Sequence, residues 1–326
     1  MTGSEAQRAF LVEAFAHAQT LANMGLSNMA EGQSADATQA FEWLYGTTDV
    51  PMMRAAARLS LEGISQNASP VQGEPQGGDF ETADVRVYCT HDRLREGTAR
   101  AGGETRFFDT VTKEFLRAKF DCTRAMAWTI VPAEDQYPDT LQFCPWFLDY
   151  AMKQTAQFQG QFKPGKIGSM ISKLKLDRLT TWALYTPIDL FQLFDKVIVH
   201  ELAHTRRGRE MDDVGGFSGY GWKNCRALST QRGETSPHTN ADSLALYASI
   251  SALIRDGGMV REDGTFAKGP GGAGGADEGN EGEAVTKSGA EIPDENNEPE
   301  PFLEPLAVRR QVLQFNPSSL KGRPLF

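Results

Sequence analysis

The residues with the clearest chemical potential are two histidines four positions apart, His200 and His204, with Glu201 directly after the first. In a helix, this spacing places both imidazoles on one face, one turn apart, where both can bind one metal ion at about 2.0–2.1 Å. Glu201 projects beside them and can accept a proton from a metal-bound water molecule. With five histidines in 326 residues, chance yields about 0.005 such patterns per chain, so the pattern predicts a catalytic zinc site.

A catalytic zinc ion needs a third protein ligand, and in this chain the ligand is not a third histidine. In one class of HExxH enzymes, the third histidine follows at the spacing HExxHxxGxxH. This chain has Arg207 at the glycine position and Glu210 at the histidine position. The sequence therefore excludes that class and favours an acidic ligand.

Three acidic residues after His204 could complete the site. Glu234 could serve as a glutamate from a later helix, but it stands between glycine and proline residues that favour a loop. Asp212 and Asp213 follow the histidine closely and precede the glycine-rich stretch 214–219. A turn so soon after the helix can bring a carboxylate back to the histidines, and carboxylate oxygen binds zinc well.

The helix that carries the motif is expected to begin near Thr186. Thr186 can cap its N-terminus, Pro187 suits the first turn, and Asp189 interacts favourably with the helix dipole. The buried stripe of this helix is expected to consist of Phe191, Phe194 and Ile198.

Hydrophobic periodicity predicts the elements that must surround this helix. Apolar residues at helical spacing predict helices at residues 5–25, 36–45, 51–62 and 241–255, the last beginning at Asn240 or Asp242. Alternation of polar and apolar residues predicts strands at residues 83–88, 125–131 and 140–143. The chain is therefore expected to be mostly helical with a small sheet.

Composition and charge exclude two classes of partner. No apolar run approaches the roughly 18 residues that a membrane-spanning helix needs. The formal net charge of -10 argues against nucleic acid as the main partner, because phosphate binding requires a basic surface. Ten acidic residues and one lysine lie between residues 270 and 304, so the rest of the chain is nearly neutral.

Composition also divides the chain into a body and a tail. Residues 257–305 are rich in glycine and acids, so burial of apolar surface there cannot offset the chain entropy. We expect a folded domain over residues 1–256 and a disordered segment over 257–305. Residues 306–326 regain apolar side chains and are expected to dock on the domain or on a partner.

Three segments occur in a characteristic order along the chain. They are HELAH at 200–204, MDDVGGFSGYGW at 211–222, and Asn-Ala-Asp at 240–242. With these segments the chain resembles the aspzincin metallopeptidases, the family that includes deuterolysin and peptidyl-Lys metalloendopeptidase. The resemblance covers about residues 80–256, although the Gly-Thr pair of the family is missing and its Asp-to-Tyr gap is shorter than the one in this chain.

The resemblance implies roles for the residues of the motif and the loop. It implies that His200, His204 and Asp213 are the zinc ligands and that Glu201 is the catalytic base. Asp213 is favoured over Asp212 by its spacing from the second histidine. The aspartate that does not bind zinc would be a solvated charge, or it would orient a ligand histidine.

Two further residues take roles from the same resemblance. Tyr220 would donate a hydrogen bond to the oxyanion of the tetrahedral intermediate, or else it would pack under the loop. Asp242 matches the position that faces the substrate pocket in the Lys-specific members, which implies a preference for Lys or Arg after the scissile bond. The alternative is that Asp242 caps a helix.

The four cysteines fit the resemblance as well. It implies a disulfide between Cys122 and Cys144, which leaves Cys89 and Cys225 as the second expected pair. Disulfides form in oxidising compartments, so we expect a secreted protein. The N-terminal residues lack the charged and apolar regions of a signal peptide, which keeps a cytoplasmic location as the alternative.

Taken as an expectation, the resemblance implies an α+β zincin-like fold, mostly helical, with a small mixed sheet and a zinc site between two lobes. The expected function is that of a zinc metalloendopeptidase with one zinc ion per chain, in which Glu201 moves the proton. We expect a monomer that acts on proteins or peptides, without nucleic-acid or membrane partners. The alternative is a catalytically silent binding protein on the same scaffold, and the intact Glu201 argues against it.

Overall fold

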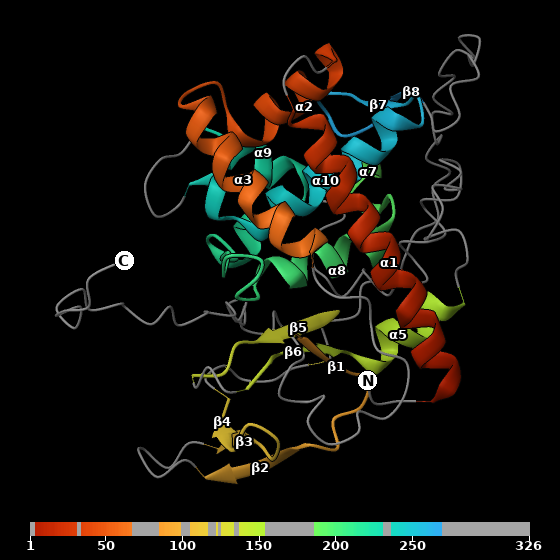
Figure 1. The fold of residues 1–326 in the computed structure, drawn as a ribbon, viewed down its shortest axis with the longest axis vertical. Helices are drawn as coiled ribbons and strands as arrows, with labels where there is room; N and C mark the ends of the chain where they lie inside the picture. The colour runs from red at the N-terminus through yellow and green to blue at the C-terminus, as the bar shows by residue number, and fades with distance from the viewer. Residues whose placement is uncertain are drawn as a thin grey trace, which may run out of the picture.

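The protein consists of a helical layer above a layer of small sheets (Figure 1). Glu234, residues 269–305 and residues 306–326 lie outside the described part of the chain, so the expectations for them stay predictions. The structure, a computed structural model, describes residues 4–30, 34–66, 85–98, 105–116, 122, 125–133, 137–153, 186–230 and 236–268.

The helical layer is built around α10 (Ala241–Arg255). Its residues from Ala241 to Leu253 are all buried, as expected of a helix that lies inside a core rather than on its surface. The helices α1 (Glu5–Asn28), α2 (Ala35–Tyr45) and α8 (Leu193–Ala203) pack against it, and α3 (Val50–Ser65) packs against α1 and α8.

Local sequence signals explain where these helices begin. Ser4 begins α1 with a capping box, in which its hydroxyl accepts from the Gln7 backbone and the Gln7 side chain accepts from the Ser4 backbone. Asn240, and not Asp242, is the residue that precedes the first turn of α10. The four helices predicted at residues 5–25, 36–45, 51–62 and 241–255 are present, with ends that differ by a few residues.

The prediction of one continuous helix from Thr186 through the motif is wrong. The chain forms the short α7 (Pro187–Leu190), then breaks at Gln192, whose φ of 49° is left-handed, and starts again as α8. The Asp189 carbonyl, which a continuous helix would bond to a backbone N–H, instead accepts from the Lys196 side chain. Phe191 and Phe194 are both fully buried, as expected of the stripe predicted for this segment.

A mixed three-stranded sheet lies directly below α8 (Figure 1). Its order is β1-β6-β5, with β6 (Asp139–Phe143) parallel to β1 (Val85–Tyr88) and antiparallel to β5 (Ala127–Ile130). All three strands were predicted, although their ends differ. Phe194 of α8 stacks on Phe143 of β6 with ring centroids 5.2 Å apart, which fixes the motif helix on the sheet.

The sequence patterns missed a second, antiparallel sheet formed by β2 (Leu94–Thr98), β3 (Thr105–Asp109) and β4 (Glu114–Phe115). Arg93 joins this sheet to the first one. Its Nε donates to Asp109 Oδ2 at 2.9 Å, it also donates to Gln142 of β6, and its guanidinium lies 3.8 Å from the centre of the Tyr88 ring. The joint between the sheets is therefore a buried polar cluster, which no apolar periodicity reveals.

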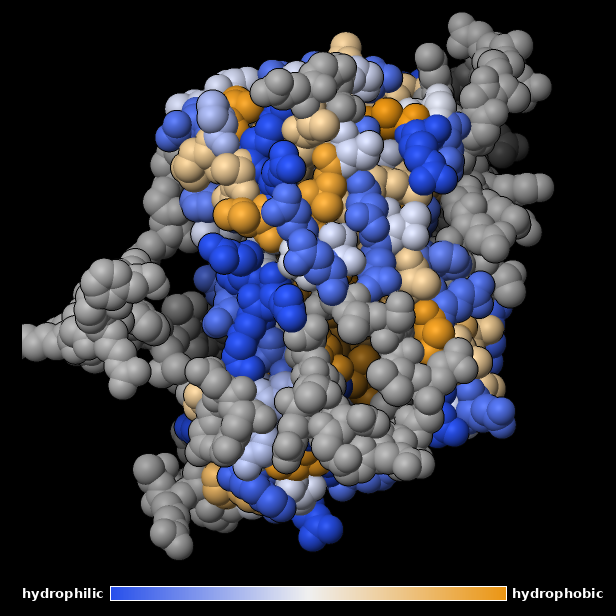
Figure 2. Space-filling model, viewed as in Figure 1, coloured by the Kyte–Doolittle hydropathy of each residue, from blue (hydrophilic) through white to orange (hydrophobic). Residues whose placement is uncertain are grey.

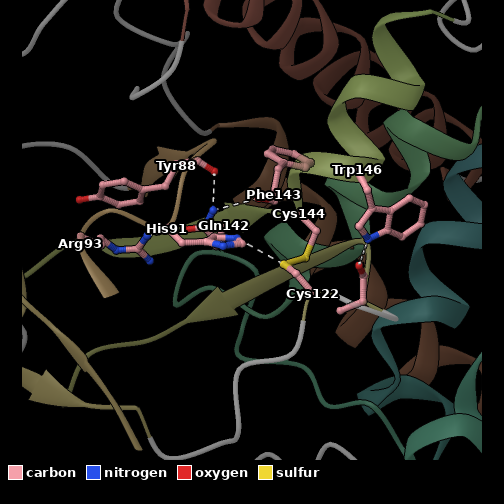
Figure 3. The surroundings of a disulfide bond; sticks show 9 residues. Tyr88, His91, Arg93, Cys122, Gln142, Phe143, Cys144 and Trp146 are labelled. Atoms are coloured by element: carbon pink, nitrogen blue, oxygen red, sulfur yellow. Dashed lines mark hydrogen bonds between the residues drawn. A yellow bond between two sulfur atoms is a disulfide. The ribbon is translucent and has the colours of Figure 1, made fainter. Parts of the chain in front are cut away.

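The expected disulfide between Cys122 and Cys144 is present, and it lies beside His91 and Gln142 (Figure 3). Cys144 follows β6 directly and precedes α5 (Pro145–Met152), so the bond anchors the chain just before β5 to the end of β6. Closing a loop of this length contributes about 3 kcal/mol in the chain-entropy model.

The expected Cys89–Cys225 disulfide is wrong, because the two residues lie in different layers. Cys89 follows β1 in the sheet layer, whereas Cys225 lies on α9 (Trp222–Leu228) in the helical layer. Both are buried thiols. The Cys225 thiol contacts the Gly219 carbonyl at 3.2 Å and the Asn240 amide at 3.5 Å.

The expected boundary of the folded body at residue 256 is also wrong. Residues 257–268 form a turn and the hairpin of β7 (Met259–Val260) and β8 (Phe266–Lys268). The hairpin loop accepts two hydrogen bonds from the body, from the Ile188 N–H to the Gly264 carbonyl and from the Trp222 indole to the Glu262 carbonyl. Burial of Val260 and these bonds show that the body extends at least to residue 268.

The surface of the helical layer alternates hydrophilic and hydrophobic side chains on the face that Figure 2 shows. Among the described residues, the large hydrophobic side chains that stay exposed are Met52 and Leu59, both on α3. Within the same residues, no helix has the length and apolar character that crossing a bilayer requires.

Candidate metal centre

The two histidines of the motif lie at the C-terminal end of α8. His200 is in its last turn and His204 is the C-cap residue, still with helical backbone angles. The spacing of four residues therefore places both imidazoles on one face of the helix, as expected from the sequence. Their two Nε2 atoms are 3.2 Å apart. Both side chains are buried, because α1, α3 and α10 pack around the helix.

Asp213 brings its carboxylate to the same point. Its Oδ1 lies 3.2 Å from Nε2 of His200 and 3.2 Å from Nε2 of His204. The chain reverses directly after α8 through a hydrogen bond from the Met211 N–H to the Ala203 carbonyl, as the early turn in the sequence predicts. The three side chains form the one group of possible metal ligands found among the described residues.

The choice between Asp212 and Asp213 is decided by the backbone. Asp212 forms an isolated bridge with Asn240, in which its N–H donates to the Thr239 carbonyl and its own carbonyl accepts from Ala241. This bridge places the side chain of the next residue, Asp213, against the histidines. The loop that carries Asp213 thus contacts the start of α10. The segment at 211–222 therefore lies next to the Asn-Ala-Asp segment at 240–242.

The three donor atoms fit a zinc ion. A tetrahedral ion with bonds of about 2.0–2.1 Å places its ligand atoms about 3.3 Å from one another, and here all three separations are 3.2 Å. Asp213 Oδ1 is a buried oxygen that accepts no hydrogen bond within the described part of the chain. A buried carboxylate oxygen without a donor is costly unless a cation satisfies it.

The second nitrogen of each imidazole faces an acceptor. His204 Nδ1 lies 2.6 Å from the Met211 carbonyl oxygen, and His200 Nδ1 lies 3.3 Å from Asp242 Oδ1. Such acceptors favour a proton on Nδ1, which leaves the Nε2 lone pair for a metal. Both rings are therefore arranged as zinc ligands usually are.

Asp242 contacts a histidine of the motif, and its expected role in the substrate pocket stays a prediction. It is buried; one carboxylate oxygen faces His200, and the other accepts from the Gly221 N–H at 2.7 Å. Gly221 has a φ of 79°, which favours glycine at this close approach. The N-cap residue of α10 is Asn240, and the Asp242 carboxylate lies behind the candidate ligand His200.

Asn240 holds the loop that carries Asp213, and sequence reasoning gave it no such role. Its Oδ1 accepts from the Val214 N–H at 3.2 Å, and its Nδ2 donates to the Gly219 carbonyl at 2.9 Å. One amide thus fixes both ends of the glycine-rich stretch. The position of Asn240 just before a helix was visible in the sequence, but its distant partners were not.

Glu201 lies beside the metal ligands and does not belong to the ligand group. Its Oε2 accepts a hydrogen bond of 2.7 Å from the Thr129 hydroxyl of β5, and the same hydroxyl lies 2.9 Å from the Glu201 backbone carbonyl. The carboxylate is buried at the contact between α8 and the sheet. The carboxylate is therefore held by the sheet and lies outside the ligand group.

Tyr220 stacks on a ligand histidine. Its ring centroid is 5.4 Å from that of His200, at an interplanar angle of 27°. Burial and then the charge of Asp213 raise the pKa of Tyr220 well above its ordinary value, and Glu201 adds to the effect. The phenol therefore keeps its proton at neutral pH and remains a hydrogen-bond donor at the site.

Buried opposite charges stabilise the ionised carboxylates of the centre. Burial would raise the pKa of Asp213, but His204 and His200 hold it well below its ordinary value. Burial would also raise the pKa of Asp242, but the contact with His200 and the charge of Lys196 lower it. Both aspartates are therefore anionic at neutral pH, and a bound cation would take over the stabilising charge from the histidines, which must be neutral to act as ligands.

Comparison with known proteins adds a distant likeness to a solved structure. No family model matches the sequence, and no curated protein matches it. Among solved structures, the chain is similar to a zinc peptidase from Grifola frondosa, with 14% identity and a TM-score of 0.39. The match covers 77% of this chain and 98% of that one. Because the similarity is so low, it supports no chemical role, and only the geometry of the site does.

Proposed function

We propose that this protein is a zinc-dependent endopeptidase that hydrolyses peptide bonds in proteins. The observation that carries the proposal is the triangle of His200 Nε2, His204 Nε2 and Asp213 Oδ1, with all sides 3.2 Å, beside the tethered carboxylate of Glu201. Three protein ligands leave the fourth tetrahedral position open, which distinguishes catalytic from structural zinc sites.

The chemistry requires an acid–base group next to the metal. When bound, zinc acts as a Lewis acid that polarises the scissile carbonyl and acidifies water. Glu201 accepts the proton of the attacking water and delivers it to the leaving amine nitrogen. Its burial limits access of bulk water to the carboxylate, so the proton stays on the reaction path.

Tyr220 is assigned the role of stabilising the negative charge that develops on the scissile carbonyl oxygen. Stacked on His200 and protonated at neutral pH, the phenol can donate a hydrogen bond to the carbonyl oxygen as that oxygen becomes an oxyanion. The loop from Asp213 to Tyr220, which Asn240 holds at Val214 and Gly219, supplies both a ligand and this donor.

Asp242 is assigned to the orientation of His200 and not to substrate. The expected preference for Lys or Arg after the scissile bond rested on this carboxylate, and both of its oxygens are engaged inside the protein. We therefore derive no basic preference from it. The buried Lys196, which lowers the pKa of Asp242, supplies part of the compensating charge.

Maturation in an oxidising compartment belongs to the same proposal. The Cys122–Cys144 disulfide supports it, because disulfides persist mainly in secreted proteins. A soluble monomer acting on protein substrates remains the expectation for partners. No described contact favours the alternative of a silent binding protein over an enzyme.

The test is hydrolysis of casein by the purified full chain loaded with one equivalent of zinc. We expect cleavage that a chelator abolishes and that added zinc restores. Elemental analysis on the same samples measures the zinc content. A protein that binds zinc but leaves casein and a diverse peptide library intact would refute the proposal and favour the silent binding protein.

A further inference from the structure

The hydroxyl of Thr129 is the strongest contact between the sheet layer and the chemical groups of α8. It lies 2.7 Å from Glu201 Oε2 and 2.9 Å from the Glu201 carbonyl oxygen. A hydroxyl has one proton to donate, and hydrogen bonds to ionised acceptors are the stronger ones. The proton is therefore directed at the carboxylate.

Thr129 stands on a rigid support. It lies in β5, opposite Leu141 of the fully buried strand β6. The start of β5 is held by a hydrogen bond from the Cys144 N–H to the Met126 carbonyl and by the disulfide at the same cysteine. Figure 1 shows β5 running beneath α8, and the two elements are in contact.

We propose that Thr129 is a positioning residue for Glu201, an inference that rests on the proposed function. By holding Oε2, the hydroxyl directs Oε1 toward the attacking water. It also keeps the carboxylate from swinging onto the metal, where carboxylate oxygen is a good ligand. A glutamate side chain has several rotatable bonds, so a fixed partner on another element removes conformations in which it cannot act as a base.

A purely structural role predicts different behaviour. If the hydroxyl served only to join β5 to the Glu201 carbonyl, its removal would lower stability and leave kcat unchanged per zinc-loaded molecule. If it positions the base, its removal lowers kcat while KM and zinc content stay near those of the wild type. A base that is misplaced by about 1 Å costs on the order of 100-fold in rate.

The first experiment compares Thr129→Val, which removes the hydroxyl and keeps the shape, with Thr129→Ser, which keeps the hydroxyl. In the zinc-loaded full chain, we expect Thr129→Val to lower kcat by about 10- to 100-fold and Thr129→Ser to retain most of the activity. The matched control is Thr140→Val on β6, whose hydroxyl bonds to Ile130 and not to Glu201. We expect this control to keep kcat near that of the wild type.

Three outcomes would overturn the inference. They are wild-type kcat in Thr129→Val, equal losses in Thr129→Val and Thr129→Ser, and an equal loss in Thr140→Val. Melting temperature and zinc content are measured for each variant. If the valine variant does not fold, Thr129→Ala takes its place beside Thr129→Ser, with the same expected ratio.

A second readout does not depend on turnover. Acetohydroxamate binds a metal with its oxygens and shares a proton with a nearby carboxylate. Its Kd, measured by calorimetry on zinc-loaded protein, should rise about 10-fold in Thr129→Val, as for the loss of one hydrogen bond to a charged group. An unchanged Kd would overturn the inference. If wild type cleaves no peptide while this shift appears, the proposed function fails and the positioning role of Thr129 stands.

Discussion

The helical layer and the sheet layer contribute different parts of the centre. Among the described residues, the helical layer supplies all three candidate metal ligands from one short stretch, because His200, His204 and Asp213 lie on α8 and the loop directly after it. The sheet layer supplies the partner of the base, Thr129, which is 72 residues away from Glu201 in sequence. Metal binding is therefore local in the chain, whereas the orientation of the base depends on how the two layers pack.

The layers also differ in what holds them together. The helical layer surrounds the buried helix α10 with apolar side chains. The two small sheets are joined by the buried Arg93–Asp109 pair and anchored by the Cys122–Cys144 disulfide. The first sheet shares the apolar core through residues such as Leu141 and Phe143, whereas no described residue of β2, β3 or β4 belongs to it, so polar links carry more of the second sheet's stability. This comparison predicts that substitutions of the candidate ligands in the helical layer weaken metal binding. Substitution of the partner of the base in the sheet layer should instead lower the catalytic rate and leave metal binding unchanged.

The largest effect is expected at the residue where the layers meet. Glu201→Gln should lower kcat for peptide hydrolysis by about 10²- to 10⁴-fold, because the amide cannot accept the proton. Zinc content should persist, since Glu201 is outside the ligand triangle. Turnover and elemental analysis on one preparation measure both properties. Near wild-type turnover would mean that another group is the base.

The next effect tests whether the ligands are confined to the helical layer and its loop. Asp213→Ala should weaken zinc binding by more than about 100-fold, because only two protein ligands remain. Asp212→Ala is the matched control, since its backbone and not its side chain forms the bridge to Asn240. Competition with a chromogenic chelator measures both affinities. Equal losses in the two variants would contradict the assignment of the third ligand.

A smaller effect on zinc affinity is expected at Asp242, the residue behind His200. Asp242→Asn should weaken zinc binding by about 10- to 100-fold, because the carboxylate that faces His200 is replaced by a neutral amide. The preference for the residue after the scissile bond should not change. Mass spectrometry of cleaved peptide libraries measures that preference. Unaltered zinc affinity together with loss of a Lys or Arg preference would restore the substrate-pocket assignment.

The smallest effect concerns the end of the folded body. Deleting residues 257–305 should lower the melting temperature by about 5–10 °C, because the hydrogen-bond partners of Ile188 and Trp222 and the buried Val260 are lost. Deleting residues 269–305 should leave it nearly unchanged, since glycine- and acid-rich sequence buries little. Thermal unfolding followed by circular dichroism compares the two. A large fall in both would show that the acidic segment packs on the body.

Much of the helical layer was predictable because helical periodicity is local. The helices at 5–25, 36–45, 51–62 and 241–255 follow from spacing within each segment. The break at Gln192 did not follow, because it depends on Lys196 bonding to the Asp189 carbonyl. The hairpin of β7 and β8 was missed because its strands are short and lie in glycine-rich sequence.

The sequence by itself determined that two imidazoles share a helical face with a glutamate between them, since 3.6 residues per turn leave no other arrangement. It narrowed the third ligand to two adjacent aspartates. Only the tertiary structure decided that Asp213 lies against the two histidines, that Asp242 stands behind His200, and that the Thr129 hydroxyl bonds to Glu201. Those contacts join segments that are far apart in the chain, and their geometry is set by how α8, α10 and β5 pack rather than by any local pattern.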